Sequence, residues 1–153
     1  MTVFDPKDEA PKLLRRVVVL AQRRYDKRPR PAIRSWRELA SLMEPGANLD
    51  REAFWVLPMD ASNRLIGLYV ANIGTATSAV VDIPAVLRVL LATQAASVTF
   101  VHNHPSGHSA PSPEDSGLLR RLKSALDLFE IDLFDNVIVG QNGAFSYAEA
   151  RML

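Results

Sequence analysis

Residues 96–115 read ASVTFVHNHPSGHSAPSPED, and this stretch decides the fold class. The apolar run at 96–101 is typical of a short strand buried in a sheet. Proline, glycine and serine predict a loop from His102 to Ser112. A helix then begins, because serine is a favoured N-cap residue and Pro113 suits the first helical turn. A strand, a loop and a helix in this order favour a mixed α/β domain.

The rest of the chain extends this pattern in both directions. Apolar runs bounded by turn residues predict further strands, at 53–60, 64–74, 78–82, 131–140 and 143–149. Apolar residues at three-to-four spacing predict helices, at 6–27, 35–43, 83–94 and 113–129. The first two strands are expected to form a hairpin, and Ser35 and Glu38 to form a capping box. We expect one α/β domain at residues 35–153, with a mixed sheet flanked by helices, preceded by a helical extension at 1–34.

The composition excludes several classes of protein. Of 153 residues, 48% are hydrophobic and 23% are charged, the mixture of a globular domain rather than a disordered or fibrous chain. The absence of cysteine excludes disulfides, thiolate metal sites, iron–sulfur clusters and cysteine nucleophiles. The longest apolar run is too short to cross a bilayer, and the N-terminus lacks the basic-then-apolar order of a signal peptide. We therefore expect a cytoplasmic protein with no membrane-spanning segment.

The charge is unevenly distributed along the chain. Residues 12–30 hold eight basic residues and one acid, Asp26, a net charge of +7. The whole chain has a net charge of +1, so the remainder carries −6. Such a segment either binds phosphates, as in nucleic-acid binding, or forms a solvated helix face. No aromatic residues interleave with the charges as a single-strand binder would need, which favours the solvated face.

The histidines of the chain all lie in the loop: His102, His104 and His108. Histidines two positions apart at a strand end project from the same face and can share one cation. Asp115 can supply a third ligand and water the fourth position of a zinc tetrahedron. The alternative is that the histidine pair is structural or merely exposed, and that Ser112 and Asp115 only cap the helix. The two interpretations are compatible, because a cap also fixes the direction of Asp115.

Together these residues form a more specific pattern. His102-x-His104, seven residues that begin with Pro105, and Ser112-x-x-Asp115 resemble the JAMM signature of the JAB/MPN metalloprotease family. The wider text, over about residues 50–150, resembles the RadC-type branch of that family. The resemblance implies the JAB/MPN fold, which is similar to the cytidine-deaminase-like architecture, with zinc at one end of the sheet.

The resemblance also implies roles for individual residues. His102, His104 and Asp115 would bind Zn²⁺, and the Ser112 hydroxyl would stabilise an oxyanion. A glutamate near the start of an early strand would deprotonate the zinc-bound water, and Glu52 is the best match. The implied activity is that of a zinc metallohydrolase acting on a peptide or isopeptide substrate. Glu52 could instead be an exposed residue at a strand start.

The chain departs from the family pattern at three places. RadC-type proteins usually carry a helix-hairpin-helix region ahead of this domain, whereas the basic helix at 6–27 stands in its place. Asn136 follows Asp135 where relatives commonly have a histidine, and His108 is expected to be a rim residue. Two alternatives to a hydrolase therefore stay open: a non-catalytic, metal-bearing interaction module, and a DNA-repair-associated protein that binds DNA through residues 12–30. The extension at 1–34 is expected either to pack on the domain or to mediate homodimer formation.

Overall fold

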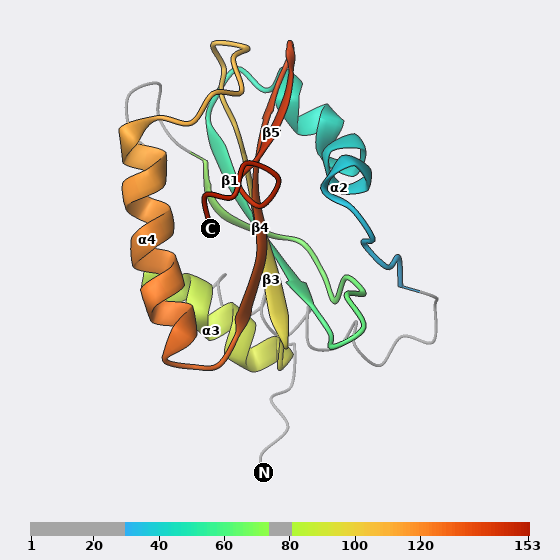
Figure 1. Cartoon of the computed structure of the whole chain (residues 1–153), viewed down its shortest axis with the longest axis vertical. Coiled ribbons are helices and arrows are strands. Elements are labelled where there is room, and N and C mark those ends of the chain that lie inside the picture. The colour runs from blue at the N-terminus through green and yellow to red at the C-terminus, as the bar shows by residue number, and fades with distance from the viewer. Residues whose placement is uncertain (1–29, 74–80) are drawn as a thin grey trace, which may run out of the picture.

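The computed structural model describes residues 30–73 and 81–153 (Figure 1). A five-stranded sheet in the order β2-β1-β3-β4-β5 forms its centre. The strands are β1 (Ala53–Met59), β2 (Tyr69–Ile73), β3 (Ser97–Asn103), β4 (Asp132–Gly140) and β5 (Gly143–Ser146). The helices are α2 (Trp36–Met43), the 3₁₀ helix η1 (Glu44–Asn48), α3 (Ile83–Thr93) and α4 (Pro113–Asp127). The predicted mixed α/β fold is confirmed, and it is consistent with a JAB/MPN fold.

Helices cover both faces of the sheet. Side chains alternate along each strand, and apolar side chains point to both faces, so both need to be covered. In Figure 1 α3 and α4 lie on one side of the strands and α2 lies on the other. Phe54, Val56 and Phe100 belong to the buried cluster that packs against α3 and α4. Trp55 and Val101, at alternate positions, belong to the second cluster, which packs against α2 and η1. Each strand therefore contributes to two cores, and β1 and β3 are buried along their whole lengths.

The pairing of β1 with β3 determines what lies opposite the histidines. The two strands are antiparallel, and their recorded register runs from Met59 opposite Ser97 to Phe54 opposite His102. Strand β3 is parallel to β4, which requires a crossover, and α4 provides it. The loop between β3 and α4 therefore begins at the end of a central, fully buried strand.

The structure confirms most of the predicted elements and corrects three of the predicted strands. The helix at 36–43 begins at the predicted N-cap Ser35, whose hydroxyl accepts a hydrogen bond from the Glu38 N–H. The predicted strand at 64–74 is wrong in its first half: Arg64 and Leu65 form only isolated bridges, with Ala32 and Met59. The second bridge joins the segment to Met59, the last residue of β1, and β2 begins only at Tyr69.

The last predicted strand, at 143–149, ends earlier than expected. Strand β5 stops at Ser146 because the next residues turn back. The buried Asp135 carboxylate accepts hydrogen bonds from the Ala148 N–H, at 3.0 Å, and from the Ser146 hydroxyl, at 2.6 Å. A carboxylate that binds both the end of the strand and the turn after it explains the reversal.

Some predictions fall outside the described residues. The helix at 6–27 lies there entirely, as does the basic segment at 12–30 except for Arg30, so DNA binding and self-association stay predictions. Most of the predicted strand at 78–82 also lies there. Its last residue, Asp82, is not in a strand but caps α3, where its carboxylate accepts a hydrogen bond from the Ala85 N–H. Among the described helices, none combines the length and the apolar character needed to cross a membrane.

Candidate metal site

Strand β3 brings two histidines to one end of the sheet. His102 is the penultimate residue of the strand and is almost fully buried, whereas His104 follows the strand and is partly exposed. Their ring centroids lie 5.1 Å apart, as expected for side chains two positions apart on one face. The His104 N–H donates to the Val139 carbonyl, which extends the pairing with β4 beyond the end of β3. The prediction of a histidine pair at a strand end is confirmed.

The first turn of α4 brings Asp115 to the same place. The Ser112 hydroxyl accepts a hydrogen bond from the Asp115 N–H at 3.0 Å, and Asp115 Oδ2 accepts one from the Ser112 N–H at 2.7 Å. This reciprocal pair is a capping box, and Pro113 occupies the first helical turn. The cap fixes the direction of the Asp115 side chain. The predicted cap is present, and it orients the predicted ligand.

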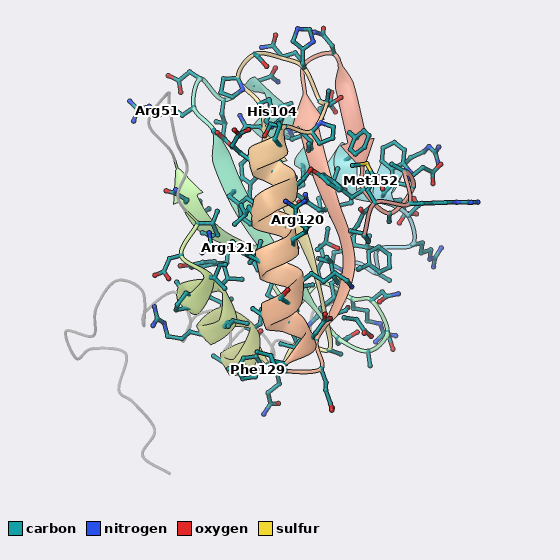
Figure 2. The ribbon with its side chains drawn as sticks, turned by 60° about the vertical axis from the view of Figure 1, so that its left-hand side comes forward. Arg51, His104, Arg120, Arg121, Phe129 and Met152 are labelled. Carbon is teal, nitrogen blue, oxygen red and sulfur yellow. The ribbon has the colours of Figure 1, made fainter. Side chains whose placement is uncertain are left out.

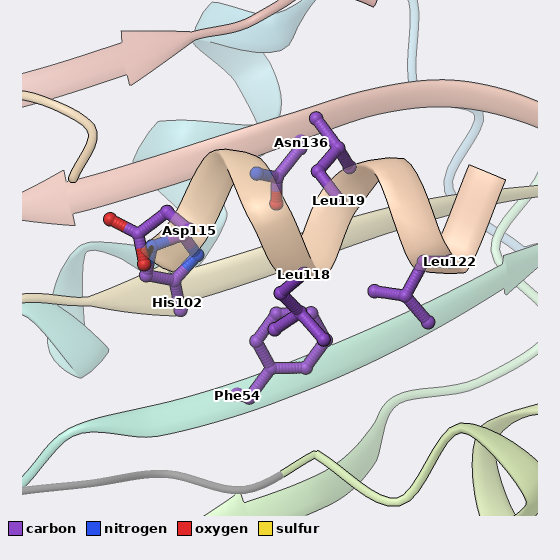
Figure 3. Close-up of a pocket in the computed structure, with 7 residues that line it drawn as sticks. All are labelled: Phe54, His102, Asp115, Leu118, Leu119, Leu122 and Asn136. Carbon is purple, nitrogen blue, oxygen red and sulfur yellow. Dashed lines mark ion pairs between the residues drawn. The ribbon is translucent and has the colours of Figure 1, made fainter. Parts of the chain in front are cut away.

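The three side chains converge. Asp115 Oδ1 lies 3.3 Å from His102 Nε2, and Asp115 Oδ2 lies 3.2 Å from His104 Nε2. One ligand atom from each residue lies within 4.8 Å of the other two. Figure 3 shows the Asp115 carboxylate beside the His102 ring, and Figure 2 shows His104 at the N-terminal end of α4. The structure thus assembles the set of residues that the sequence predicted.

The charges of the three groups are strongly coupled. Burial alone would raise the pKa of Asp115, but the two imidazoles and the Ser112 N–H together hold that pKa well below its usual range. The hydrogen bond with Asp115 raises the pKa of His104, although burial opposes the shift. The carboxylate is therefore ionised at neutral pH, as a metal ligand must be.

The outer nitrogen of His104 is fixed by the main chain. His104 Nδ1 lies 3.0 Å from the His108 carbonyl oxygen, which can only accept, so Nδ1 must carry the proton and donate it. The neutral ring then presents an unprotonated Nε2 to the site, the form that binds metal. The loop that supplies this carbonyl is itself anchored, since the Gly107 N–H donates to the His104 carbonyl and the Asn142 N–H to the Gly107 carbonyl. His108 therefore contributes through its backbone, and its side chain is exposed, as predicted for a rim residue.

His102 is held by packing instead. Its ring stacks on Phe54 with 5.8 Å between centroids and 15° between planes. Both ring nitrogens of His102 are buried, and within the part of the chain that the structure describes neither meets the geometry of a hydrogen bond; Nε2 has only the Asp115 carboxylate beside it, at 3.3 Å. The ring belongs to a pocket beneath the site (Figure 3), which is lined by Phe54, His102, Asp115, Leu118, Leu119, Leu122 and Asn136.

These features fit a bound metal ion. A buried imidazole nitrogen without a hydrogen bond is costly unless it has another partner, and a cation is such a partner. Two imidazoles and one carboxylate form a donor set typical of catalytic zinc. Each imidazole Nε2 lies 3.2 or 3.3 Å from one of the two Asp115 oxygens, and one ligand atom from each of the three residues lies within 4.8 Å of the others. The cluster can therefore hold a metal ion.

Glu52 lies next to the cluster but is not part of it. It precedes β1 by one residue and is half-buried. The recorded register ends with Phe54 opposite His102, and its continuation by two residues sets Glu52 opposite His104. Side chains opposite each other in an antiparallel pair share a face and lie about 4.5–5.5 Å apart at Cβ. In agreement, the charge of Glu52 contributes to the raised pKa of His104.

Two residues of the site were missed or misjudged in the sequence. Asn103 is fully buried, although it stands between the two histidines at the end of a strand. Its side-chain bonds to β1 could not be anticipated without the β1–β3 register. Asn136 was noted only as a departure from the family pattern; it lines the same pocket as His102, and its Oδ1 is buried without a hydrogen-bond partner among the described residues.

Comparison with known proteins agrees with the geometry. Residues 33–152 match the family described as the RadC-like JAB domain. Among similar curated proteins, a UPF0758 protein of Desulforudis audaxviator is 37% identical over 113 residues, which cover 73% of this chain and 49% of the relative. One from Pseudoalteromonas translucida is 40% identical over 105 residues (69% and 47%), and one from Leptothrix cholodnii is 38% identical over 143 residues (92% and 62%). The chain thus spans about half the length of the first two of these relatives. The chain belongs to the family of RadC-like JAB domains.

Proposed function

We propose that this domain is a zinc-dependent metallohydrolase that cleaves peptide or isopeptide bonds. The observation that carries the proposal is the convergence of His102, His104 and Asp115 within 4.8 Å at one end of the sheet. Three ligands of this kind leave one position of a tetrahedron open, which is the arrangement of catalytic rather than structural zinc. Bound there, zinc would lower the pKa of a water molecule to about 7 and polarise a carbonyl group.

In this proposal Glu52 is the general base and general acid that carries the proton. Continuation of the β1–β3 register sets Glu52 opposite His104, and Glu52 is not one of the three grouped ligands. A carboxylate in this position can accept a proton from the attacking water at one Oε and later donate that proton to the leaving amine. Protonation of the leaving amine is the step that makes an amide cleavable.

Ser112 supplies a hydroxyl beside the ligands. Its Oγ accepts the hydrogen bond from the Asp115 N–H, so the hydroxyl keeps its own proton for donation. A donor held by the helix cap can stabilise the negative charge that develops on a carbonyl oxygen during attack. In this proposal Ser112 has two roles: as the helix cap it orients the ligand Asp115, and its hydroxyl donates a hydrogen bond to the substrate oxygen.

The test compares Glu52→Gln with the wild type, and Asp50→Asn serves as the matched control. Asp50 is an exposed acid two residues away, so its variant tests for unspecific effects of a lost negative charge. Each protein is loaded with one equivalent of zinc and assayed against a library of internally quenched peptides and against Nε-glycyl-lysine isopeptides. We expect Glu52→Gln to keep its zinc and to lose about 100- to 10,000-fold in kcat, the range for a lost general acid–base. Asp50→Asn should behave as the wild type.

Two outcomes would contradict the proposal. Hydrolysis that survives Glu52→Gln unchanged would exclude Glu52 as the proton carrier. A zinc-loaded wild type without activity towards any peptide or isopeptide would instead favour the non-catalytic, metal-bearing interaction module. Zinc analysis of every sample separates a lost metal from a lost proton carrier, because Glu52 is not a ligand and its replacement should leave the metal content unchanged.

A further inference from the structure

The position of Asn103 in the core is unusual for a polar side chain. It alternates with the two histidines, so its side chain leaves β3 on the opposite face of the sheet. The neighbours of that face are apolar: Val101 and Val139 belong to the cluster packed against α2. Asn103 is nonetheless fully buried, and burial of an amide is costly unless all its hydrogen bonds are formed.

The amide of Asn103 holds the two peptide groups that flank Glu52. Its Oδ1 accepts a hydrogen bond from the Ala53 N–H at 2.7 Å, and its Nδ2 donates one to the Arg51 carbonyl at 3.0 Å. A donor and an acceptor on one side chain thus take the place of a backbone rung, one position past the last recorded pair of β1 and β3. These two bonds fix the backbone on both sides of one residue, and that residue is Glu52.

We propose that Asn103 is the positioning residue for Glu52, and that its two hydrogen bonds hold the Glu52 carboxylate opposite His104. The proposal rests on the proposed function, since it assigns Asn103 to the same reaction. Without the bonds, the segment before Ala53 would be the frayed end of a strand, and Glu52 would lose its fixed direction. Figure 2 shows Arg51 at the same end of the molecule as His104.

The chemistry of the amide makes the assignment specific. Leucine has the same branched outline as asparagine at Cγ but can form neither bond, so Asn103→Leu removes the hydrogen bonds and leaves no cavity. Thr93→Val is the matched control. Thr93 is equally buried and its hydroxyl donates to the Val89 carbonyl. It lies at the end of α3, which leads into the opposite end of β3 from the histidines.

The first measurement is amide hydrogen exchange by NMR, which needs no activity. In the wild type the Ala53 amide should exchange far more slowly than that of exposed Arg51. In Asn103→Leu its protection should fall by at least tenfold, whereas Thr93→Val should leave it unchanged. If the Ala53 amide of the wild type exchanges as fast as that of Arg51, the clamp does not exist and the proposal is overturned, even where Asn103→Leu fails to fold.

The second measurement is kinetic, on the zinc-loaded proteins and the substrate identified in the peptide screen. We expect Asn103→Leu to keep one zinc per chain and its KM, and to lose about 100-fold in kcat, the cost of a reacting group displaced by about 1 Å. In the Glu52→Gln background the same change should cost nothing further, because Asn103 acts through Glu52. Equal losses in both backgrounds, or a loss of zinc, would overturn the proposal. An inactive wild type would refute the proposed function alone, and the exchange measurement would still decide on the clamp.

Discussion

His104 Nε2 and Asp115 Oδ2 face each other across 3.2 Å, although the two residues belong to different elements. Each residue is also held by the main chain: His104 Nδ1 by the His108 carbonyl, and Asp115 Oδ2 by the Ser112 N–H. The two side chains are thus preorganised towards one point. Such support from outside the ligands is what gives a metal site its affinity and geometry.

The capping serine should matter for both stability and chemistry. Ser112→Ala removes the acceptor for the Asp115 N–H, and the loss of a helix N-cap costs about 0.5–2 kcal/mol in the free energy of unfolding. It also removes the hydroxyl donor near the ligands, for which a loss of about 100- to 1,000-fold in kcat is expected. Urea unfolding and assays of the zinc-loaded variant measure the two effects. Ser124→Ala, on the exposed side of α4, is the control and should change neither. Unchanged turnover in Ser112→Ala would show that the serine caps the helix but does not take part in the reaction.

The loop that orients His104 depends on a close approach between two glycines. A Cβ on Gly140 would lie 2.5 Å from the Gly107 carbonyl oxygen, which is main-chain and has little freedom to move. Gly140→Ala should therefore displace the loop that carries the His108 carbonyl. We expect a loss of about 1–3 kcal/mol in stability and about 10- to 100-fold weaker zinc binding, measured by unfolding and by competition with a chelator.

Gly117→Ala is the opposite control for that experiment. Gly117 lies inside α4, and its added Cβ would meet only the end of the Arg120 side chain, at 3.9 Å. Replacement of a helical glycine by alanine should raise the stability by about 0.5–1 kcal/mol and leave zinc binding unchanged. If Gly140→Ala is as stable and binds zinc as tightly as the wild type, the loop does not support His104.

Asp135 should make the stability depend on pH. Burial raises the pKa of this carboxyl above the usual value of 3.8, although its hydrogen bonds with Ser146, Ala148 and Asn136 oppose the shift. Between 3.8 and the raised value, the native state binds more protons than the unfolded state. The contribution of Asp135 is therefore greatest below that window and declines as the pH rises through it.

Asp135→Asn tests this dependence with little change of shape, because the amide retains one acceptor for the two N–H groups and a donor for Ser146. The free energy of unfolding, measured in urea from pH 4 to pH 7, should fall with pH more steeply in the wild type than in the variant. Parallel curves would show that Asp135 does not titrate in this range.

Much of the fold followed from local patterns. The capping residues Ser35 and Ser112 begin their helices as predicted, because an N-cap depends on only a few neighbouring residues. The ends of strands were less predictable. Strand β5 ends at Ser146 because Asp135, eleven residues earlier, binds the turn that follows. Such a contact cannot be seen in the sequence around residue 146.

The same division holds for the site. His102, His104 and Asp115 were predictable because their spacing within one strand, loop and helix is local. Asn103 was not, because its function depends on partners fifty and fifty-two residues earlier in the chain. The orientation of His104 by the His108 carbonyl could not be predicted either, because every residue type has a main-chain carbonyl and the sequence does not show which one binds the ring.

The central claim is that His102, His104 and Asp115 form a zinc site, and metal content tests it most directly. The protein is purified without a His-tag or chelator, equilibrated with zinc at neutral pH, and analysed by plasma mass spectrometry. His104→Ala removes a ligand, whereas His108→Ala removes an exposed ring and keeps the carbonyl that supports His104. We predict about one zinc per chain in the wild type and in His108→Ala, and almost none in His104→Ala. A wild type that binds no zinc, or equal zinc in all three proteins, would contradict the account.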